Sequence, residues 1–306
     1  MKLRLRGRTL DLAAGAPALM GIVNATPDSF SDPQGDKTLA ALVERALAQV
    51  EAGAAIVDVG GESGRTDRRA VAVEEEIARV VPLVARLASE GLAVSVDTWR
   101  VPVARAALDA GAVLINDVSG LGDPAIANAC AQTGAGLVIA HTRAAPKTKA
   151  FPAYDDVVAD VIELLGDRAA VAADRGVEPE QLLLDPGIDL AKTPAESVEL
   201  LRRLEELEPL GRPLLLAISR KDFVGALTGR PPRERDAGTL AAVEPALDVA
   251  PGAVLRVHDV GAVADFVSVR SALRGTAPPP EGALAAALRR ESAPGQAVAF
   301  AARNRP

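Results

Sequence analysis

Continuously apolar segments recur eight times along the chain, and an alanine-rich amphipathic segment follows each one. Most of the apolar runs do not alternate with polar residues, which is typical of parallel strands that are buried on both faces. The predicted strands cover residues 18–25, 55–60, 93–98, 113–119, 136–141, 182–187, 213–219 and 253–260.

The segments between these runs have the periodicity of helices. The predicted helices cover residues 38–52, 71–90, 100–110, 124–134, 155–175, 194–209, 237–249 and 261–273. The stretches EAGAA, LDAGAV and QTGAG place a glycine between a helix and the next strand, which is a helix-stop signal. Eight unbroken strand–helix units predict an α/β fold, a (β/α)8 TIM barrel in a single domain. An open doubly wound sheet is the alternative, but no glycine-rich dinucleotide turn follows the first strand.

The barrel is expected to cover residues 18–274, after an N-terminal segment at 1–17. The tail at 275–306 contains a proline run, and we expect it to be partly disordered with a short helix at 281–291. The basic start of the chain is followed by interrupted apolar residues, which make a poor signal peptide. No run of about 18 apolar residues is present, so we expect a cytoplasmic protein without a membrane span.

The charge and the cysteine content exclude several classes of protein. A net charge of -7 and a pI near 5.1 argue against a nucleic-acid partner or a membrane-surface role. The single cysteine, Cys130, allows no internal disulfide and lies in an alanine-rich helical stretch. We interpret it as a buried structural thiol.

Polar residues stand at the end of every predicted strand. They are Asn24, Asp58 with Glu62, Asp97, Asn116 with Asp117, His141, Asp185, Ser219 with Lys221, and Arg256 with His258. Each of them alone could be a helix cap or a structural residue. Because the strand ends of a parallel barrel meet at one mouth, their convergence predicts an active site there.

The residue types indicate what this site binds. Asp97, Asn116 and Asp185 can accept hydrogen bonds from the N–H groups of a flat heterocycle. Lys221 and Arg256 can only donate, which suits a ring carbonyl, an aromatic face or an anion.

A second group of residues is expected to bind an anion. The first and last strands are neighbours in a closed barrel, so Asn24, Arg256 and His258 are expected to lie close together. His141 and His258 are the two histidines of the chain, and both stand at strand ends. This placement favours a functional role over that of a core histidine.

Several motifs in order make the chain resemble dihydropteroate synthase over residues 18–274. The motifs are GIVNATPDSFSD, VDVGGES, VSVDT, LINDVSG, LLLDPGI followed by KTP, ISRKDFVG, GTLAA and LRVHDV. The resemblance implies a (β/α)8 transferase of folate biosynthesis. Its reaction joins 6-hydroxymethyl-7,8-dihydropterin diphosphate to p-aminobenzoate and releases pyrophosphate.

The resemblance also implies roles for individual residues. The pterin would be bound by Asp97, Asn116, Asp185, Lys221 and Arg256, of which Asp97, Lys221 and Arg256 are the catalytic candidates. The diphosphate would be bound by Asn24, Arg256 and His258, with Mg²⁺ at Asn24. The p-aminobenzoate would be bound by Phe30, Arg65, Ser219 and Lys221. We also expect a homodimer. The loops at 25–36 and 61–70 are rich in Gly, Pro, Asp and Ser and lack a periodic apolar face, so we expect them to be mobile without ligand. The stretch TPDSFSD in the first of these loops would close over the bound diphosphate.

The chain departs from the family's pattern near the expected p-aminobenzoate site. The family continues its second loop as GESTRPG, where Gly64 and Thr66 replace the threonine and the proline. Ala140 replaces a methionine, and Asp189 and Leu190 replace a glycine and a phenylalanine. VDTWR, the AHT loop and SRKDFVG resemble a divergent actinobacterial paralogue branch. The alternative is therefore a pterin-binding paralogue with weak or no synthase activity.

Two further enzyme classes fit the sequence less well. A methyltetrahydrofolate-handling methyltransferase would not need Lys221, Arg256 and the diphosphate-type loop. A Schiff-base aldolase would need a lysine within a strand, whereas Lys221 follows the strand end and RKDF is typical of a helix start.

Overall fold

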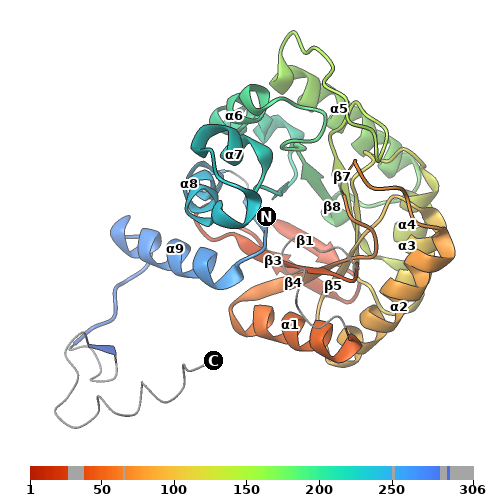
Figure 1. Cartoon of the computed structure of the whole chain (residues 1–306), viewed down its shortest axis with the longest axis horizontal. Helices are drawn as coiled ribbons and strands as arrows, with labels where there is room; N and C mark the ends of the chain where they lie inside the picture. Colours follow the sequence, from red (N-terminus) through yellow and green to blue (C-terminus); the bar gives the residue numbers. More distant parts are fainter. Residues whose placement is uncertain (27–37, 65, 250–251, 283–287, 290–306) are drawn as a thin grey trace. The chain divides into compact units, whose positions relative to one another are not determined.

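The computed structural model describes residues 1–26, 38–64, 66–249, 252–282 and 288–289 (Figure 1). The chain divides into two compact units, residues 1–267 and 268–306. The first unit holds all of the described strands and the candidate active site.

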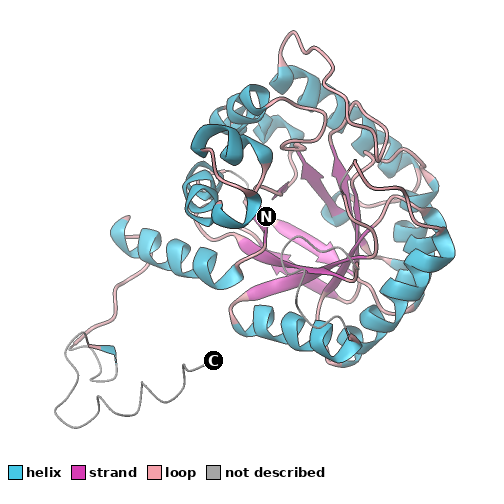
Figure 2. Cartoon of the chain, in the orientation of Figure 1, coloured by secondary structure: helices cyan, strands magenta, loops and turns pink. Residues whose placement is uncertain are grey.

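Eight parallel strands form a closed barrel in the order β10-β3-β4-β5-β6-β7-β8-β9, which confirms the predicted TIM barrel. The strands are β3 (Ala18–Asn24), β4 (Ala54–Gly60), β5 (Val94–Asp97), β6 (Leu114–Asp117), β7 (Gly136–Ala140), β8 (Leu182–Asp185), β9 (Leu214–Leu216) and β10 (Ala253–Val257). The ring closes where β10 pairs with β3, with Arg256 opposite Met20. Figure 2 shows the strands inside a ring of helices.

The helices follow the strands as the sequence predicts, with one addition and one break. They are α1 (Leu39–Glu51), α2 (Val73–Ser89), α3 (Val101–Asp109), α4 (Ala125–Thr133), α5 (Val157–Asp174), α6 (Pro194–Arg202), α7 (Asp222–Thr228), α8 (Asp236–Leu247) and α9 (Val260–Leu273). The predicted helix at 194–209 ends at Arg202 and continues as a 3₁₀ helix over Leu204–Leu210. Pro209 lies within this 3₁₀ helix. The added helix is α7, a short element between two predicted ones.

Local signals explain several helix ends. Thr193 caps α6 in a capping box with Glu196, and Asp156 caps α5 by accepting hydrogen bonds from Val158 and Ala159. Gly134 ends α4 in the left-handed conformation, as QTGAG predicts.

The N-terminal segment is a β-hairpin of β1 (Lys2–Leu5) and β2 (Arg8–Asp11). Leu3 and Leu5 are fully buried, together with apolar side chains from the barrel interior such as Ile56 and Leu183. The hairpin thus belongs to the inner core of the barrel. A second, larger core lies between the strands and the surrounding helices.

The structure also bears on the cysteine and on membrane-spanning helices. Cys130 is a buried free thiol, and burial raises its pKa to about 12, as expected for a structural cysteine. Among the described residues, no helix is both long and apolar enough to cross a membrane.

Candidate active site

A buried ion-pair cluster joins side chains of β10, β4, β5 and β6 at the mouth of the barrel, across the intervening β3. Arg256 of β10 donates from Nε to Asp58 Oδ2 over 2.6 Å and from Nη2 to Asp97 Oδ2 over 3.0 Å. Asn116 Nδ2 donates to the same Asp58 oxygen over 3.1 Å. The structure therefore brings together Asp97, Asn116 and Arg256, three of the predicted site residues. Asp58 joins them, and nothing in the sequence identifies it as their shared partner.

The two carboxylates of this cluster differ in burial and in their electrostatic surroundings. Burial raises the pKa of Asp97 to about 7, although the Arg256 guanidinium opposes that shift. Asp58 is fully buried, so its charge requires a partner, and Arg256 provides it. One arginine thus balances two carboxylates, and Asp97 is the more accessible of the two, with a side chain that is 28% exposed.

Asp185 and Lys221 come from β8 and from the segment after β9, on the other side of β10. Asp185 ends β8, and its Oδ1 accepts a hydrogen bond from Gly187 N–H over 2.7 Å. Burial raises the pKa of Asp185. Lys221 immediately precedes α7, and its Nζ donates to Ile188 O in the loop after β8 over 2.8 Å. The two predicted pterin ligands are therefore connected through a single loop.

The predicted anion cluster is less compact than expected. Arg256 is committed to two carboxylates, and His258 Nδ1 lies 2.9 Å from Ser219 Oγ. Burial lowers the pKa of His258 to about 3, so its ring is neutral at pH 7. Asn24 lies beside Gly60 of β4, four residues further along β3 than the partner of Arg256. No hydrogen bond is recorded among the three side chains in the described chain, and their anion-binding role stays a prediction.

Arg220 is a residue that the sequence reasoning missed. Its guanidinium forms a bidentate ion pair with Asp236, with Nε 2.7 Å and Nη2 3.0 Å from the carboxylate oxygens. It also lines the same cavity as Ser219 and His258. Arg220 stands between Ser219 and Lys221 in the SRK motif, and this position is the sequence signal that points to it.

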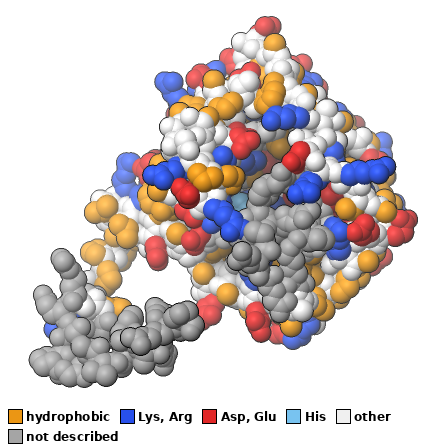
Figure 3. All heavy atoms as spheres, in the orientation of Figure 1, with side chains coloured by type: hydrophobic (Ala, Val, Ile, Leu, Met, Phe, Trp, Pro, Cys, Tyr) orange, Lys and Arg blue, Asp and Glu red, His pale blue; other side chains and the backbone are white. Residues whose placement is uncertain are grey.

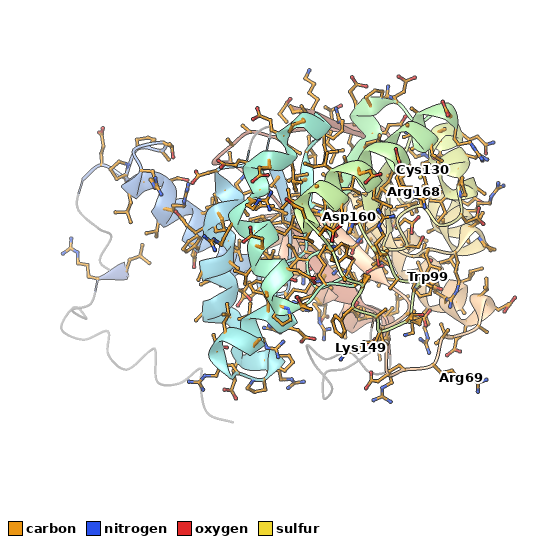
Figure 4. All side chains as sticks on the ribbon, turned by 90° about the horizontal axis from the view of Figure 1, so that it is seen from above. Arg69, Trp99, Cys130, Lys149, Asp160 and Arg168 are labelled. Atoms are coloured by element: carbon orange, nitrogen blue, oxygen red, sulfur yellow. The ribbon has the colours of Figure 1, made fainter. Side chains whose placement is uncertain are left out.

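A cavity of about 830 Å³ opens beside these strand ends. We call it the outer chamber. Its wall includes apolar, cationic and hydroxyl side chains from several loops, among them Trp99, Phe151, Leu190, Lys149, Arg233 and Ser219. In Figure 3, Lys and Arg side chains border the middle of this face. Trp99 and Lys149 lie toward the same end of the barrel in Figure 4.

A second buried network lies next to this chamber. Lys192 is 2% exposed, and its Nζ donates to Gly187 O over 3.0 Å and to Leu190 O over 3.2 Å. It also lies 2.7 Å from His141 Nδ1, while His141 Nε2 lies 2.7 Å from Asp160 Oδ1. Burial lowers the pKa of His141 to about 4. A neutral ring that donates from Nε2 and accepts at Nδ1 satisfies both contacts, so His141 is a bridging residue inside the wall.

The loop after β4 is anchored from two directions. Lys147 Nζ donates to Ser63 O over 2.7 Å and lies 3.4 Å from Glu62 Oε1. Arg100 forms ion pairs with Glu62 and with the buried Glu76. Lys147 therefore holds a neighbouring loop in place. Two of the predicted p-aminobenzoate ligands, Phe30 and Arg65, lie outside the described residues, as does most of the loop at 25–36.

Comparisons with known proteins identify the family. Residues 20–258 match the family model described as pterin binding enzyme. The dihydropteroate synthase of Escherichia coli (strain K12) is 41% identical over 263 residues, which cover 85% of this chain and 92% of that protein. The chain belongs to the dihydropteroate synthase family. The resemblance inferred from the ordered motifs is thus confirmed.

Solved structures of the family agree with the fold. A Xanthomonas albilineans dihydropteroate synthase with 4-aminobenzoic acid is 43% identical, with a TM-score of 0.81 over 90% of this chain and 99% of that chain. The Xanthomonas enzyme in complex with 7,8-dihydropteroate matches with a TM-score of 0.78 and the same identity, over 89% of this chain and 98% of that chain. Membership of the dihydropteroate synthase family makes the chain a transferase.

Proposed function

We propose that this protein joins 6-hydroxymethyl-7,8-dihydropterin diphosphate to p-aminobenzoate and releases pyrophosphate, the reaction of its family. The observation that carries the proposal is the convergence of Asp97, Asn116, Asp185, Lys221 and Arg256 at the mouth of a dihydropteroate synthase barrel. These side chains provide acceptors and donors at one end of the barrel, beside a chamber of a size that suits a second ligand.

The pterin is bound through its polar edge. The carboxylates of Asp97 and Asp185 accept hydrogen bonds from ring N–H groups, and the amide of Asn116 can both accept and donate. Lys221 donates to the ring, and Arg256 packs over it. The ion pairs of Arg256 with Asp58 and Asp97 hold the guanidinium in place before the ligand arrives.

The leaving diphosphate lies near Asn24, Arg256 and His258. Among the described residues, no group of three or more His, Cys, Asp or Glu side chains could hold a resident metal. One amide oxygen from Asn24 suits Mg²⁺ that arrives with the diphosphate, because Mg²⁺ keeps waters and phosphate oxygens as ligands. Bound Mg²⁺ would neutralise charge on the leaving group, and Asn24 would provide its protein ligand.

The second substrate occupies the outer chamber. The Xanthomonas structure holds 4-aminobenzoic acid, the same molecule as p-aminobenzoate. In this chain Trp99, Phe151 and Leu190 provide apolar surface for the aryl ring, and Lys149 and Ser219 provide groups that can bind its carboxylate. Phe30 and Arg65 remain proposed contacts on the grounds of the resemblance.

The chemistry needs positioning more than acid–base catalysis. Pyrophosphate leaves from a methylene carbon whose developing positive charge the pterin ring stabilises, and the aniline nitrogen forms the new bond to that carbon. The nitrogen is already neutral at pH 7, so the protein's residues orient it and exclude water. The proton that the nitrogen loses passes to solvent or to the leaving group.

A pyrophosphate-release assay tests this function. The protein is supplied with 6-hydroxymethyl-7,8-dihydropterin diphosphate and Mg²⁺, with and without p-aminobenzoate. We expect release that depends on p-aminobenzoate and is lost in Lys221→Met. Release that is the same with and without p-aminobenzoate would contradict the synthase function. Pterin binding without any release would identify the chain as a pterin-binding paralogue.

The departures in the loop after β4 favour weak use of p-aminobenzoate. Gly64 and Thr66 replace the family's threonine and proline, and both line the outer chamber. A Cβ added at Gly64 would meet no atom within 4 Å, so the family's residue fits there. We expect Gly64→Thr with Thr66→Pro to lower the KM for p-aminobenzoate about ten- to a hundredfold, because about one side chain of apolar surface is restored. A micromolar KM in the unchanged protein would show that these departures are neutral.

We further propose that the protein is a cytoplasmic homodimer, on the grounds of the family resemblance. Light scattering after size-exclusion chromatography tests the dimer, and a monomer at micromolar concentration would contradict it.

A further inference from the structure

Asp189 lies in the loop between β8 and α6, and its side chain reaches the start of another helix. Its Oδ2 accepts hydrogen bonds from the backbone N–H groups of Asp222 and Phe223, the first two residues of α7. Its Oδ1 accepts from Ser197 Oγ over 3.0 Å, and its own N–H donates to Ser197 Oγ over 3.1 Å. Both carboxylate oxygens are therefore held.

The start of α7 depends on this contact. Lys221 is the N-cap residue of α7, and its side chain makes no capping hydrogen bond. A helix start leaves backbone N–H groups without an intrahelical partner, and a carboxylate is a preferred acceptor for them. Asp189 supplies that acceptor from the neighbouring loop, 33 residues earlier in the chain.

The backbone of Asp189 is in an unfavourable conformation. Its φ is +61°, in the left-handed region that most L-residues avoid. Asp and Asn occupy this region more readily than other non-glycine residues. The position combines a backbone that suits glycine with a side chain that glycine lacks, so the carboxylate itself accounts for an aspartate here.

The contact between Asp189 and the start of α7 lies next to Lys221, a proposed pterin ligand. Asp222 follows Lys221, and Ile188, whose carbonyl accepts from Lys221 Nζ over 2.8 Å, precedes Asp189. Residues 221 and 222 thus donate two hydrogen bonds to residues 188 and 189. The carboxylate binds the N–H group of the residue after Lys221, and the Lys221 ammonium donates to the carbonyl of the residue before Asp189.

We propose that Asp189 is a positioning residue, which fixes Lys221 for pterin binding by capping α7 from the loop after β8. The inference rests on the proposed function, because it takes Lys221 to be a pterin ligand. When the cap is absent, the first turn of α7 samples other conformations and a smaller fraction of the protein presents Lys221 correctly.

Two substitutions at Asp189 separate the cap from its charge. Asn tolerates the same φ and caps a helix about as well as Asp. We therefore expect Asp189→Asn to bind 6-hydroxymethyl-7,8-dihydropterin within about twofold of the unchanged protein. Gly relieves the backbone but removes the cap, and we expect Asp189→Gly to bind about three- to tenfold more weakly in calorimetry, which is the effect of losing one N-cap.

A matched control removes a cap of the same kind elsewhere. Asp156 caps α5 with its carboxylate, which accepts from Val158 N–H over 2.8 Å and from Ala159 N–H over 3.1 Å. We expect Asp156→Gly to lower the urea midpoint of unfolding but to leave pterin affinity unchanged. A loss of affinity equal to that of Asp189→Gly would mean that general destabilisation explains both results.

A double-mutant cycle with Lys221→Ala decides between positioning and structural support. If Asp189 acts through Lys221, Asp189→Gly has no further effect on pterin affinity once Lys221 is alanine. An equal loss in both backgrounds, or no loss in the unchanged background, would overturn the proposal. Unchanged affinity in Lys221→Ala alone would instead contradict the pterin role of Lys221, so the two failures are distinguishable.

Discussion

Asp97 is the residue of the proposed pterin site for which pH has a defined consequence. Burial raises its folded-state pKa to about 7, above the ordinary value of 3.8. Ionised Asp97 is therefore disfavoured in the ligand-free fold, so the stability that its protonated form contributes is lost as pH rises through about 7.

Urea unfolding of the unchanged protein and of Asp97→Asn from pH 5 to 8 measures the contribution of Asp97 to the pH dependence of stability. We expect the free energy of unfolding of the unchanged protein to fall relative to the variant as pH rises, because an amide does not ionise. A constant difference across this range would show that Arg256 keeps the carboxylate ionised throughout.

At the residue scale, the sequence predicts where a site residue lies in the fold better than it predicts which groups its side chain contacts. Asp97, Asn116 and Asp185 could be selected because parallel strands end at one mouth of a barrel, whatever their side chains contact. Lys192 and Asp189 could not be assigned in this way, because their roles depend on groups brought together by loop packing. The KTP motif that contains Lys192 was visible, but a fully buried lysine between carbonyls and a histidine has no sequence signature.

At the element scale, the loop after β4 is the segment whose order most affects the outer chamber. Its mobility was predicted from its composition, whereas the structure shows Lys147 bonded to Ser63 and close to Glu62. The predicted mobility remains untested. The contacts indicate that the loop's order depends on the loop after β7.

Amide hydrogen exchange tests this dependence. We expect Lys147→Met to speed exchange over residues 61–64 and 66–70, because the substitution removes the ammonium that joins the two loops. Lys149→Met is the matched control, since Lys149 lies over the ring of Phe151, at 5.8 Å from its centroid. Equal exchange in both variants would show that the ion pairs of Arg100 order the loop without Lys147.

The predicted elements differ from the observed ones mainly at the strand ends. The structure ends β9 at Leu216 and β10 at Val257, before Ser219 and His258, which the sequence placed within the strands. Continuous apolar runs mark where a strand is buried, but the polar residues after them leave the ladder to line the site. RKDF indicates the start of helix α7, but its extent was not predicted, because seven residues provide too little periodicity to delimit a helix.

At the scale of the whole molecule, the barrel has the candidate site at one end and the N-terminal hairpin at the other. The hairpin contacts segments that precede the strands, with Arg8 bonded to Gly91 O and Arg4 bonded to Gln181. Those segments lead into β5 and β8, so the hairpin lies at the end opposite the candidate site. The sequence identified residues 1–17 as a separate segment, but four-residue strands gave no clear signal.

This separation predicts that stability and binding can be changed independently. Leu5 is 1% exposed among inner-barrel side chains, so Leu5→Ala leaves a cavity and should lower the free energy of unfolding by about 2–5 kcal/mol. Leu10 of β2 is half-buried, and Leu10→Ala should cost clearly less. Both variants should bind 6-hydroxymethyl-7,8-dihydropterin with unchanged affinity in calorimetry below their unfolding transitions. Weaker binding in Leu5→Ala alone would mean that packing at the closed end of the barrel is coupled to the strand ends that hold Asp97 and Asp185.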